Sequence, residues 1–185
     1  MASKIKVDEL ETADGTGTIA LQNQLSGMTT ASLPTLTDAQ MPAGSVLQVV
    51  NATHSTEAQT SSNSWSDTGL TATITPTSSS NKILVIFSLN GVAKESSDTS
   101  VKIQSLYNIG GGSYTGATSF GTRSAYTGGN DKIGIGSVSG SLLLSLSTTS
   151  AVNVKLQQAS NSNSATAIVQ ETNATSTITL MEIAG

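Results

Sequence analysis

The sequence predicts an all-β protein: an antiparallel, jelly-roll-like β-sandwich preceded by an extended N-terminal arm. Ser and Thr make up about three residues in ten, whereas Asp, Glu, Lys and Arg together reach only 11%. Hydroxyl-bearing side chains suit the half-buried surface of a strand, but in a helix they compete with the backbone for hydrogen bonds. The chain also carries a series of short strand-like segments separated by turn residues, which is typical of sandwiches and barrels.

Residues 1–44, which are expected to form the arm, differ from the rest of the chain. Ile5, Val7 and Leu10 alternate loosely with charged residues, and the later apolar residues follow neither a strand period nor a helix period. Such a segment buries too little apolar surface on itself to offset the entropy of ordering it. It is either a flexible tail or an arm that orders against a partner, and the spaced apolar residues favour the arm.

Residues 45–185 are expected to form the β-sandwich head domain. The first strand-like segment is 45–51, and in 70–75 Leu, Ala and Ile alternate with Thr until Pro76 ends the run. Aromatic residues are only 3% of the chain, so the core between the sheets must be aliphatic. The later segments of alternating or β-rich composition are 101–109, 152–157, 166–172 and 175–183.

Two further segments are apolar without alternation. Residues 82–89 are continuously apolar through Phe87, and 141–147 centre on three consecutive Leu residues. Continuous apolar runs of this length predict strands that are buried on both faces. Asn90-Gly91 follows the first run and predicts a tight turn or a bulge.

A glycine-rich region, 110–137, interrupts the series of strands and contains nine of the 17 Gly. A connection this long is either functional or contains a short hairpin with glycine-rich turns, and both interpretations stay open. In the functional interpretation, an exposed loop presents aromatic side chains to a sugar or a protein. The candidate receptor contacts are Tyr114, Phe120, Arg123 and Tyr126.

The residues give little support for catalysis, so we expect a protein that is not an enzyme. His54 is the only His, and no Ser lies in a Gly-x-Ser-x-Gly setting. The chain has no Cys, which excludes disulfides and thiolate chemistry. One His and scattered carboxylates predict neither a metal site nor a cofactor. A glycosidase with two distant acids stays open, although few aromatic residues are available to line its groove.

Charge and hydropathy narrow the range of partners. The net charge is -4 and there is no run of basic residues, so nucleic acid is not an expected partner. No apolar run is long enough to span a membrane, and residues 1–7 lack the apolar core of a secretory signal peptide. We therefore expect synthesis in the cytoplasm without insertion into a membrane.

Three stretches resemble virion fibre proteins of tailed bacteriophages, particularly those of marine and cyanobacterial phages. KIKVDELETADGTGTIALQNQLSG (4–27) is similar to their N-terminal segments. GLTATITPTSSSNKILVIFSLNG (69–91) and TSTITLMEIAG (175–185) are similar to their C-terminal β-rich domain. A Thr-Ile-Thr-Pro motif, a Ser-rich turn and a Lys-led apolar strand occur in that family in the same order.

The resemblance implies a short homotrimeric fibre located in a virion and synthesised in the host cytoplasm. Its arm, residues 1–44, would serve in trimerisation and in attachment to other virion proteins of the tail, baseplate or capsid, with Ile5, Val7 and Leu10 as docking residues. Its head would bind a glycan or protein of the host surface. The chain lacks the repetitive shaft of longer members, so a decoration or adaptor protein of the capsid or tail is an alternative. A free carbohydrate-binding module is another, whereas the absence of a rung repeat argues against a β-helical depolymerase.

Overall fold

The described chain consists of β-strands arranged in two antiparallel sheets. A computed structural model of the protein describes residues 40–96, 99–125 and 131–185, all within the compact unit Asp38–Gly185. No helix among these residues is long and apolar enough to cross a membrane. The elements are β1 (Val46–His54), β2 (Ala58–Thr60), β3 (Ser66–Ile74), β4 (Lys82–Glu95), β5 (Thr99–Ile109), β6 (Thr115–Ala125), β7 (Ile133–Leu144), β8 (Val152–Ser160), β9 (Thr166–Val169), the 3-10 helix η3 (Glu171–Asn173) and β10 (Ser176–Ile183).

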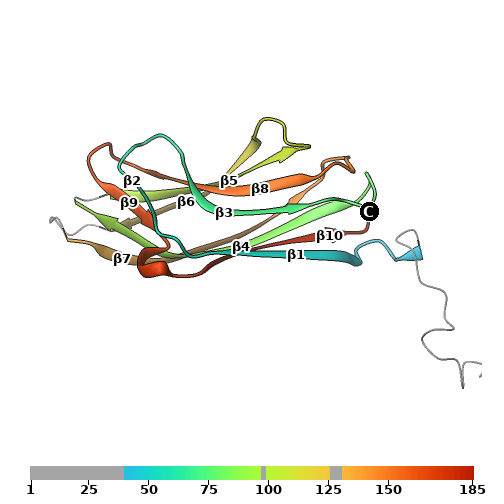
Figure 1. Cartoon of the computed structure of the whole chain (residues 1–185), viewed down its shortest axis with the longest axis horizontal. Helices are drawn as coiled ribbons and strands as arrows, with labels where there is room; N and C mark the ends of the chain where they lie inside the picture. Colours follow the sequence, from blue (N-terminus) through green and yellow to red (C-terminus); the bar gives the residue numbers. More distant parts are fainter. Residues whose placement is uncertain (1–39, 97–98, 126–130) are drawn as a thin grey trace, which may run out of the picture. The chain divides into compact units, whose positions relative to one another are not determined.

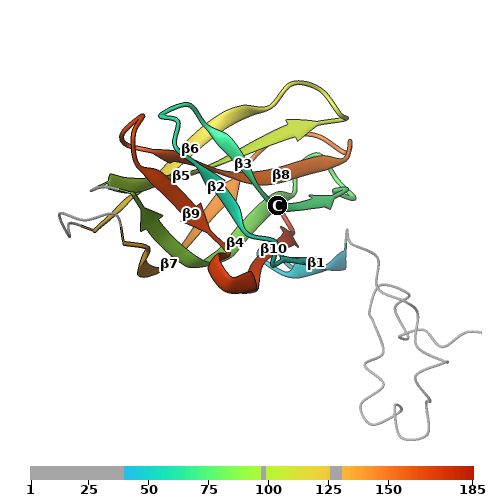
Figure 2. The same ribbon diagram turned by 60° about the vertical axis from the view of Figure 1, so that its left-hand side comes forward.

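Each sheet forms one layer of a sandwich. The first sheet has the order β1–β10–β4–β9–β2, and β7 pairs with the other edge of β4. The second sheet has the order β3–β8–β5–β6. Figures 1 and 2 show the two layers, with β1, β10, β4 and β7 in one and β3, β8, β5 and β6 in the other.

The topology is simpler when two pairs of consecutive strands, β1 with β2 and β9 with β10, are each treated as one interrupted strand. β9 and β10 pair one after the other with the same edge of β4, and β2 and β1 pair in turn with β9 and β10. When each interrupted pair is treated as one strand, β1–β2 pairs with β9–β10, β3 with β8, β4 with β7 and β5 with β6. This nested pairing of first with last strand in a two-sheet sandwich is a jelly roll, which confirms the predicted fold class.

The core between the sheets is aliphatic, as predicted. Successive side chains of a strand point to opposite faces of the sheet, so every second side chain points inward. β3 illustrates the pattern, because Leu70, Ala72 and Ile74 are buried while the residues between them are exposed. One aromatic pair joins the two sheets: Phe87 of β4 and Phe120 of β6 meet edge to face with ring centroids 4.6 Å apart. Each fully buried Leu, Ile or Val stabilises the fold by roughly 1.5–3 kcal/mol.

Segments 82–89 and 141–147 are not buried on both faces, contrary to the prediction. In β4, Leu84 is half-buried and Ile86 is 40% exposed. In β7, Leu143 is 53% exposed. The described chain supplies only two layers, so the outer face of each strand is left without a covering layer of its own.

β4 also runs through Asn90 and Gly91 to Glu95 instead of ending in a turn. The register of its pairing with β7 shifts at this point, so the bulge alternative is correct. Gly91 has a φ of +60°, and a Cβ at this position would collide with the backbone of Glu171 in η3. Glycine therefore allows β4 to approach η3 where the neighbouring strand is interrupted.

The glycine-rich region 110–137 consists largely of strands. Gly110 and Gly111 have positive φ in the turn that joins β5 to β6, and β6 and β7 take up much of the remainder. The described part of the region therefore matches the hairpin interpretation. Residues 126–130, which include Tyr126, lie outside the described residues.

A buried carboxylate joins three segments at one end of the sandwich. Glu182 of β10 accepts hydrogen bonds from Gln48 Nε2 at 2.6 Å and Asn81 Nδ2 at 2.6 Å. It also accepts bonds from the backbone N–H of Thr77 at 2.7 Å and from the Thr77 hydroxyl at 2.8 Å. Burial raises the pKa of Glu182, but the hydrogen bonds from Asn81, Gln48 and Thr77 outweigh burial and hold the pKa below its ordinary value.

Replacing this carboxylate should destabilise the fold in a pH-dependent manner. Glu182→Gln should lower the free energy of unfolding at neutral pH by about 2–3 kcal/mol, because the amide group leaves buried donors unpaired. Folding lowers the pKa of Glu182, so its contribution is present above the ordinary value of 4.5 and is lost as the pH falls through the lower folded value. Urea denaturation of both proteins should show the difference shrinking in acid.

Glu57→Gln is the matched control for this experiment. Glu57 forms a partly exposed ion pair with Lys132, with 3.2 Å between Oε2 and Nζ. Its loss should cost less than about 1 kcal/mol, as is usual for exposed pairs. An equal loss in both variants, or a loss for Glu182→Gln that persists unchanged in acid, would contradict the role given to Glu182.

Candidate functional site

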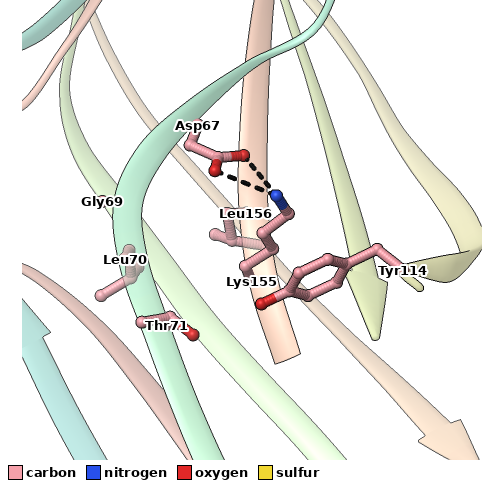
Figure 3. A pocket seen from close by; sticks show the side chains of 7 residues that line it. All are labelled: Asp67, Gly69, Leu70, Thr71, Tyr114, Lys155 and Leu156. Atoms are coloured by element: carbon pink, nitrogen blue, oxygen red, sulfur yellow. Dashed lines mark hydrogen bonds and ion pairs between the residues drawn. The ribbon is translucent and has the colours of Figure 1, made fainter. Parts of the chain in front are cut away.

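The outer face of the β3–β8–β5–β6 sheet carries a hollow with a volume of about 120 Å³. Residues of β3 and β8 form its floor and one wall, and a side chain from the end of the β5–β6 turn forms another. Figure 3 shows the side chains that line it: Asp67, Gly69, Leu70, Thr71, Tyr114, Lys155 and Leu156. The hollow is open to solvent and combines an acid, a base, an aromatic ring and a hydroxyl.

A bulge in β3 creates the hollow. The register between β3 and β8 shifts between Asp67 and Thr71. Within the bulge, Thr68 is buried and its hydroxyl donates to the carbonyl oxygen of Leu156 at 2.9 Å. Gly69 has a φ of +82°, and a Cβ there would collide with the ring of His54. His54, the lone His of the chain, therefore packs against the bulge.

An ion pair forms the charged part of the site. Lys155 Nζ lies 2.7 Å from Asp67 Oδ1 and 2.9 Å from Asp67 Oδ2, and Gln157 Nε2 donates to Oδ1 at 2.8 Å. Burial raises the pKa of Asp67, but the hydrogen bonds from Lys155 and Gln157 and the Lys155 charge outweigh it. The pKa of Asp67 therefore lies below its ordinary value, and the side chain, 57% exposed, is a carboxylate at neutral pH.

Tyr114 forms the aromatic wall of the site. The Nζ of Lys155 lies 4.1 Å from the centroid of the Tyr114 ring, a cation–π contact. Figure 3 shows the Tyr114 ring beside the Lys155 side chain, whose amino group points to Asp67. The Tyr114 hydroxyl donates to Asn153 Oδ1 at 2.5 Å. Lys155 thus holds Tyr114 at the face of its ring and Asn153 holds it at its hydroxyl, although the residue immediately precedes an edge strand.

Further polar side chains extend the site along the sheet. Asn153 Oδ1 also accepts from the Thr71 hydroxyl at 3.1 Å, and Asn153 Nδ2 donates to Thr73 Oγ1 at 2.8 Å. At the other end, Gln104 Nε2 donates to Gln157 Oε1 at 2.8 Å. The result is a continuous network across three strands that keeps its donors and acceptors at fixed positions.

This arrangement is suited to recognition. A carboxylate with accessible lone pairs, amide groups and hydroxyls can exchange hydrogen bonds with a hydroxyl-rich ligand, and an aromatic ring supplies an apolar contact surface. Within the described ranges, no three His, Cys, Asp or Glu side chains gather as metal ligands would. Because Lys155 already neutralises Asp67, the site has no strong preference for a charged ligand.

The structure describes the side chains of two of the four predicted receptor contacts, Tyr114 and Phe120. Tyr114 lines the hollow. Phe120 is partly buried and packs against Phe87 and the core. Arg123 belongs to β6, where its backbone pairs with Val101, but its side chain is not among the described groups, and Tyr126 lies outside the described residues. The predicted docking residues Ile5, Val7 and Leu10 also lie outside them.

Sequence reasoning missed Asp67 and Lys155 as partners. The alternation in 152–157 placed Lys155 on the polar face of its strand, but Asp67 precedes the segment predicted as its strand. Their contact depends on the pairing of β3 with β8 and on a bulge, and neither feature has a signal in the local sequence beyond Gly69.

The fold and the site together define an antiparallel jelly-roll domain with a polar and aromatic outer face. No family model matches the chain, and no curated protein matches its sequence. Solved structures that are similar to it include that of infectious bursal disease virus strain Gx and that of the VP2 subviral particle of infectious bursal disease virus. The identities are 10% and 14% over 75% of this chain, with TM-scores of 0.37 and 0.34. The chain spans about a third of the length of each (32% and 38%), and similarity this distant carries no functional conclusion.

Substitution of the bulge glycine should disrupt both the fold and the site. Gly69→Ala should cost about 1–2 kcal/mol for positive φ and roughly 1–3 kcal/mol more for the collision with His54. Gly121→Ala is the control, because Gly121 has a φ of +86° with no atom within 4 Å of its Cβ position. Urea denaturation should show a larger loss for Gly69→Ala, and His54→Ala should narrow the difference. Equal losses would show that the ring does not constrain the bulge.

Proposed function

We propose that the chain is a non-enzymatic structural protein of a virion: a short homotrimeric fibre. Its N-terminal arm attaches it to other virion proteins, and its sandwich binds a glycan or protein of the host surface. The resemblance of stretches 4–27, 69–91 and 175–185 to bacteriophage fibre proteins supports this proposal. The jelly roll is consistent with it, since that architecture is used by viral capsid and lectin domains.

The observation that carries the binding function is the network around Tyr114, Asp67 and Lys155. Polar groups on a solvent-exposed sheet are normally free to move, whereas these side chains are held by several mutual bonds. A fixed set of donors, acceptors and an aromatic ring reduces the entropy lost on binding. We infer that this face is directed toward the host and that its ligand is rich in hydroxyl groups.

A free carbohydrate-binding module is the second candidate, because the hollow beside Tyr114 suits a sugar in the absence of any particle. The two candidates differ in where the protein is found. Immunogold labelling of purified virions should detect a fibre, a decoration protein or an adaptor on the particle, and the position of the label distinguishes among these three. Absence of label on intact virions would support the free module.

Substitutions in the hollow should reduce binding to the host surface. Tyr114→Ala and Lys155→Met should each weaken binding of the full chain to host cells by about tenfold or more, because each removes a charge-assisted or aromatic contact. Ser139→Ala, on the outer face of the other sheet, is the matched control and should leave binding unchanged. Cell-binding titrations with fluorescent protein measure the effect, and a glycan array separates sugar from protein receptors. Full binding by both hollow variants would overturn the site.

Removal of the arm should separate folding from attachment. A chain lacking residues 1–25 should retain the circular dichroism of a β-protein, because the described core lies entirely within later residues. It should no longer join particles, because the predicted docking residues Ile5, Val7 and Leu10 are gone. Complementation of a phage that lacks the full-length protein, followed by detection of the protein on purified virions, provides the measurement. Normal incorporation of the shortened chain would refute the role of the arm.

A further inference from the structure

The outer face of the first sheet carries an apolar row that runs across four strands. Val49 of β1, Met181 of β10, Leu84 of β4 and Leu143 of β7 lie opposite one another in the strand register. The two ends of the row are the most exposed, with Val49 at 56% and Leu143 at 53%. Four large apolar side chains therefore form one line on a solvent-facing surface.

The surroundings of this row are almost without charge. Ile86 and Val46 extend the apolar area, being 40% and 50% exposed. The second outward-facing row from this one, four residues further along each strand, consists entirely of hydroxyl-bearing residues. These hydroxyl residues are Thr53, Thr177, Ser88 and Ser139. Among the described outward-facing residues of segments 46–53, 82–88, 139–143 and 177–183, Lys82 is the only one with a formal charge, and it lies at the end of the face.

The two outer faces of the sandwich therefore differ in chemistry. The β3–β8–β5–β6 face carries Asp67, Lys155 and Lys102, whereas the opposite face has an apolar centre with a polar margin. An apolar centre that lacks charge and a polar rim are the anatomy of a protein–protein interface. The continuous apolar segments 82–89 and 141–147 also match strands that are covered on both sides, which the single chain does not provide.

We propose that the β1–β10–β4–β7 face packs against the same face of further copies of this chain. The inference rests on the homotrimer of the proposed function and assigns it a surface. A three-fold axis parallel to the strands would keep the apolar rows of the three copies at the same position along the axis. The end of the row in one copy would then meet the beginning of the row in the next copy. Val49 at the β1 end of one copy then lies next to Leu143 at the β7 end of the next copy, and the rows close into an apolar ring.

Two properties of the face favour copies of the chain as the occupant. Its apolar centre carries no charged side chain among the described residues, so charges of the same sign would not be brought together there. The ion pairs of Lys132 with Glu57 and Glu171 lie away from this centre, near the start of β7, where Glu171 approaches Gly134. Four strands about 4.8 Å apart and eight residues long cover roughly 500 Å² before side-chain relief is counted. In a trimer this area is divided between two neighbours, so the face supplies only part of the roughly 600–1,000 Å² that each partner buries in a specific two-body complex.

Lysine substitutions at both ends of the apolar row test whether this face forms the trimer contact. The full wild-type chain should have three times its subunit mass of 18.7 kDa by light scattering, and Val49→Lys with Leu143→Lys should reduce this to a single subunit. Both positions are exposed on edge strands, where Lys is well tolerated, so the circular dichroism should not change. Ser119→Lys with Thr122→Lys on β6 of the opposite sheet adds the same charge at two exposed positions, and this control should remain trimeric.

Cross-linking provides a second test that does not depend on disrupting the assembly. The natural chain has no Cys, so Val49→Cys with Leu143→Cys introduces the only two thiols. Within one chain these positions are three strand spacings apart, about 14 Å, so a bis-maleimide with a reach below about 10 Å can join them only between copies. The expected product is a covalent trimer on a denaturing gel.

The outcomes separate this inference from the proposed function. A trimeric lysine variant, or a double-cysteine trimer that fails to cross-link, would overturn the assigned surface while leaving the fibre proposal intact. A wild-type chain that is monomeric at all concentrations would overturn the homotrimer and the surface together. A monomeric lysine variant that still binds host cells would support both the surface and a separate receptor site on the opposite sheet.

Discussion

The alternation of side chains along paired strands is the constraint on which the rest of this structure depends. Each strand of the jelly roll gives one row of side chains to the aliphatic core, and the nested pairing of first with last strand keeps those rows facing one another. A slip of one residue in any pairing would turn an apolar row outward. All chemistry available for binding is consequently confined to the two outer faces and to the ends of the sandwich.

Departures from regular pairing provide the features that a plain sandwich lacks. The bulge at Gly69 forms the hollow on one face. The bulge at Gly91 allows β4 to approach η3, which connects β9 to β10. Both positions have positive φ and closely approach another segment, so they require glycine. Glu182 performs a related task at the end of the sandwich, where it satisfies donors that the strand ladders leave unpaired.

The two outer faces divide the expected tasks of the protein. One face is a bonded polar and aromatic network that includes Tyr114 and Lys155. The other has Leu84 and Leu143 in a single apolar row. This division suits a protein that must associate through one surface and contact a different partner through another, because the physical requirements of the two contacts are opposed: one needs water excluded, and the other needs fixed polar groups.

The sequence by itself determined the fold class, the aliphatic core and the approximate position of most strands, because strand periodicity and turn residues are local properties. It also identified Tyr114 as a candidate contact. It did not determine that Asp67 meets Lys155, that β2 and β9 extend their neighbours, or that 82–89 has one open face. Only the tertiary structure decided these points, because each depends on which strands pair and in which register. Register is set by contacts between residues far apart in the chain, and those contacts leave no periodic signal in it.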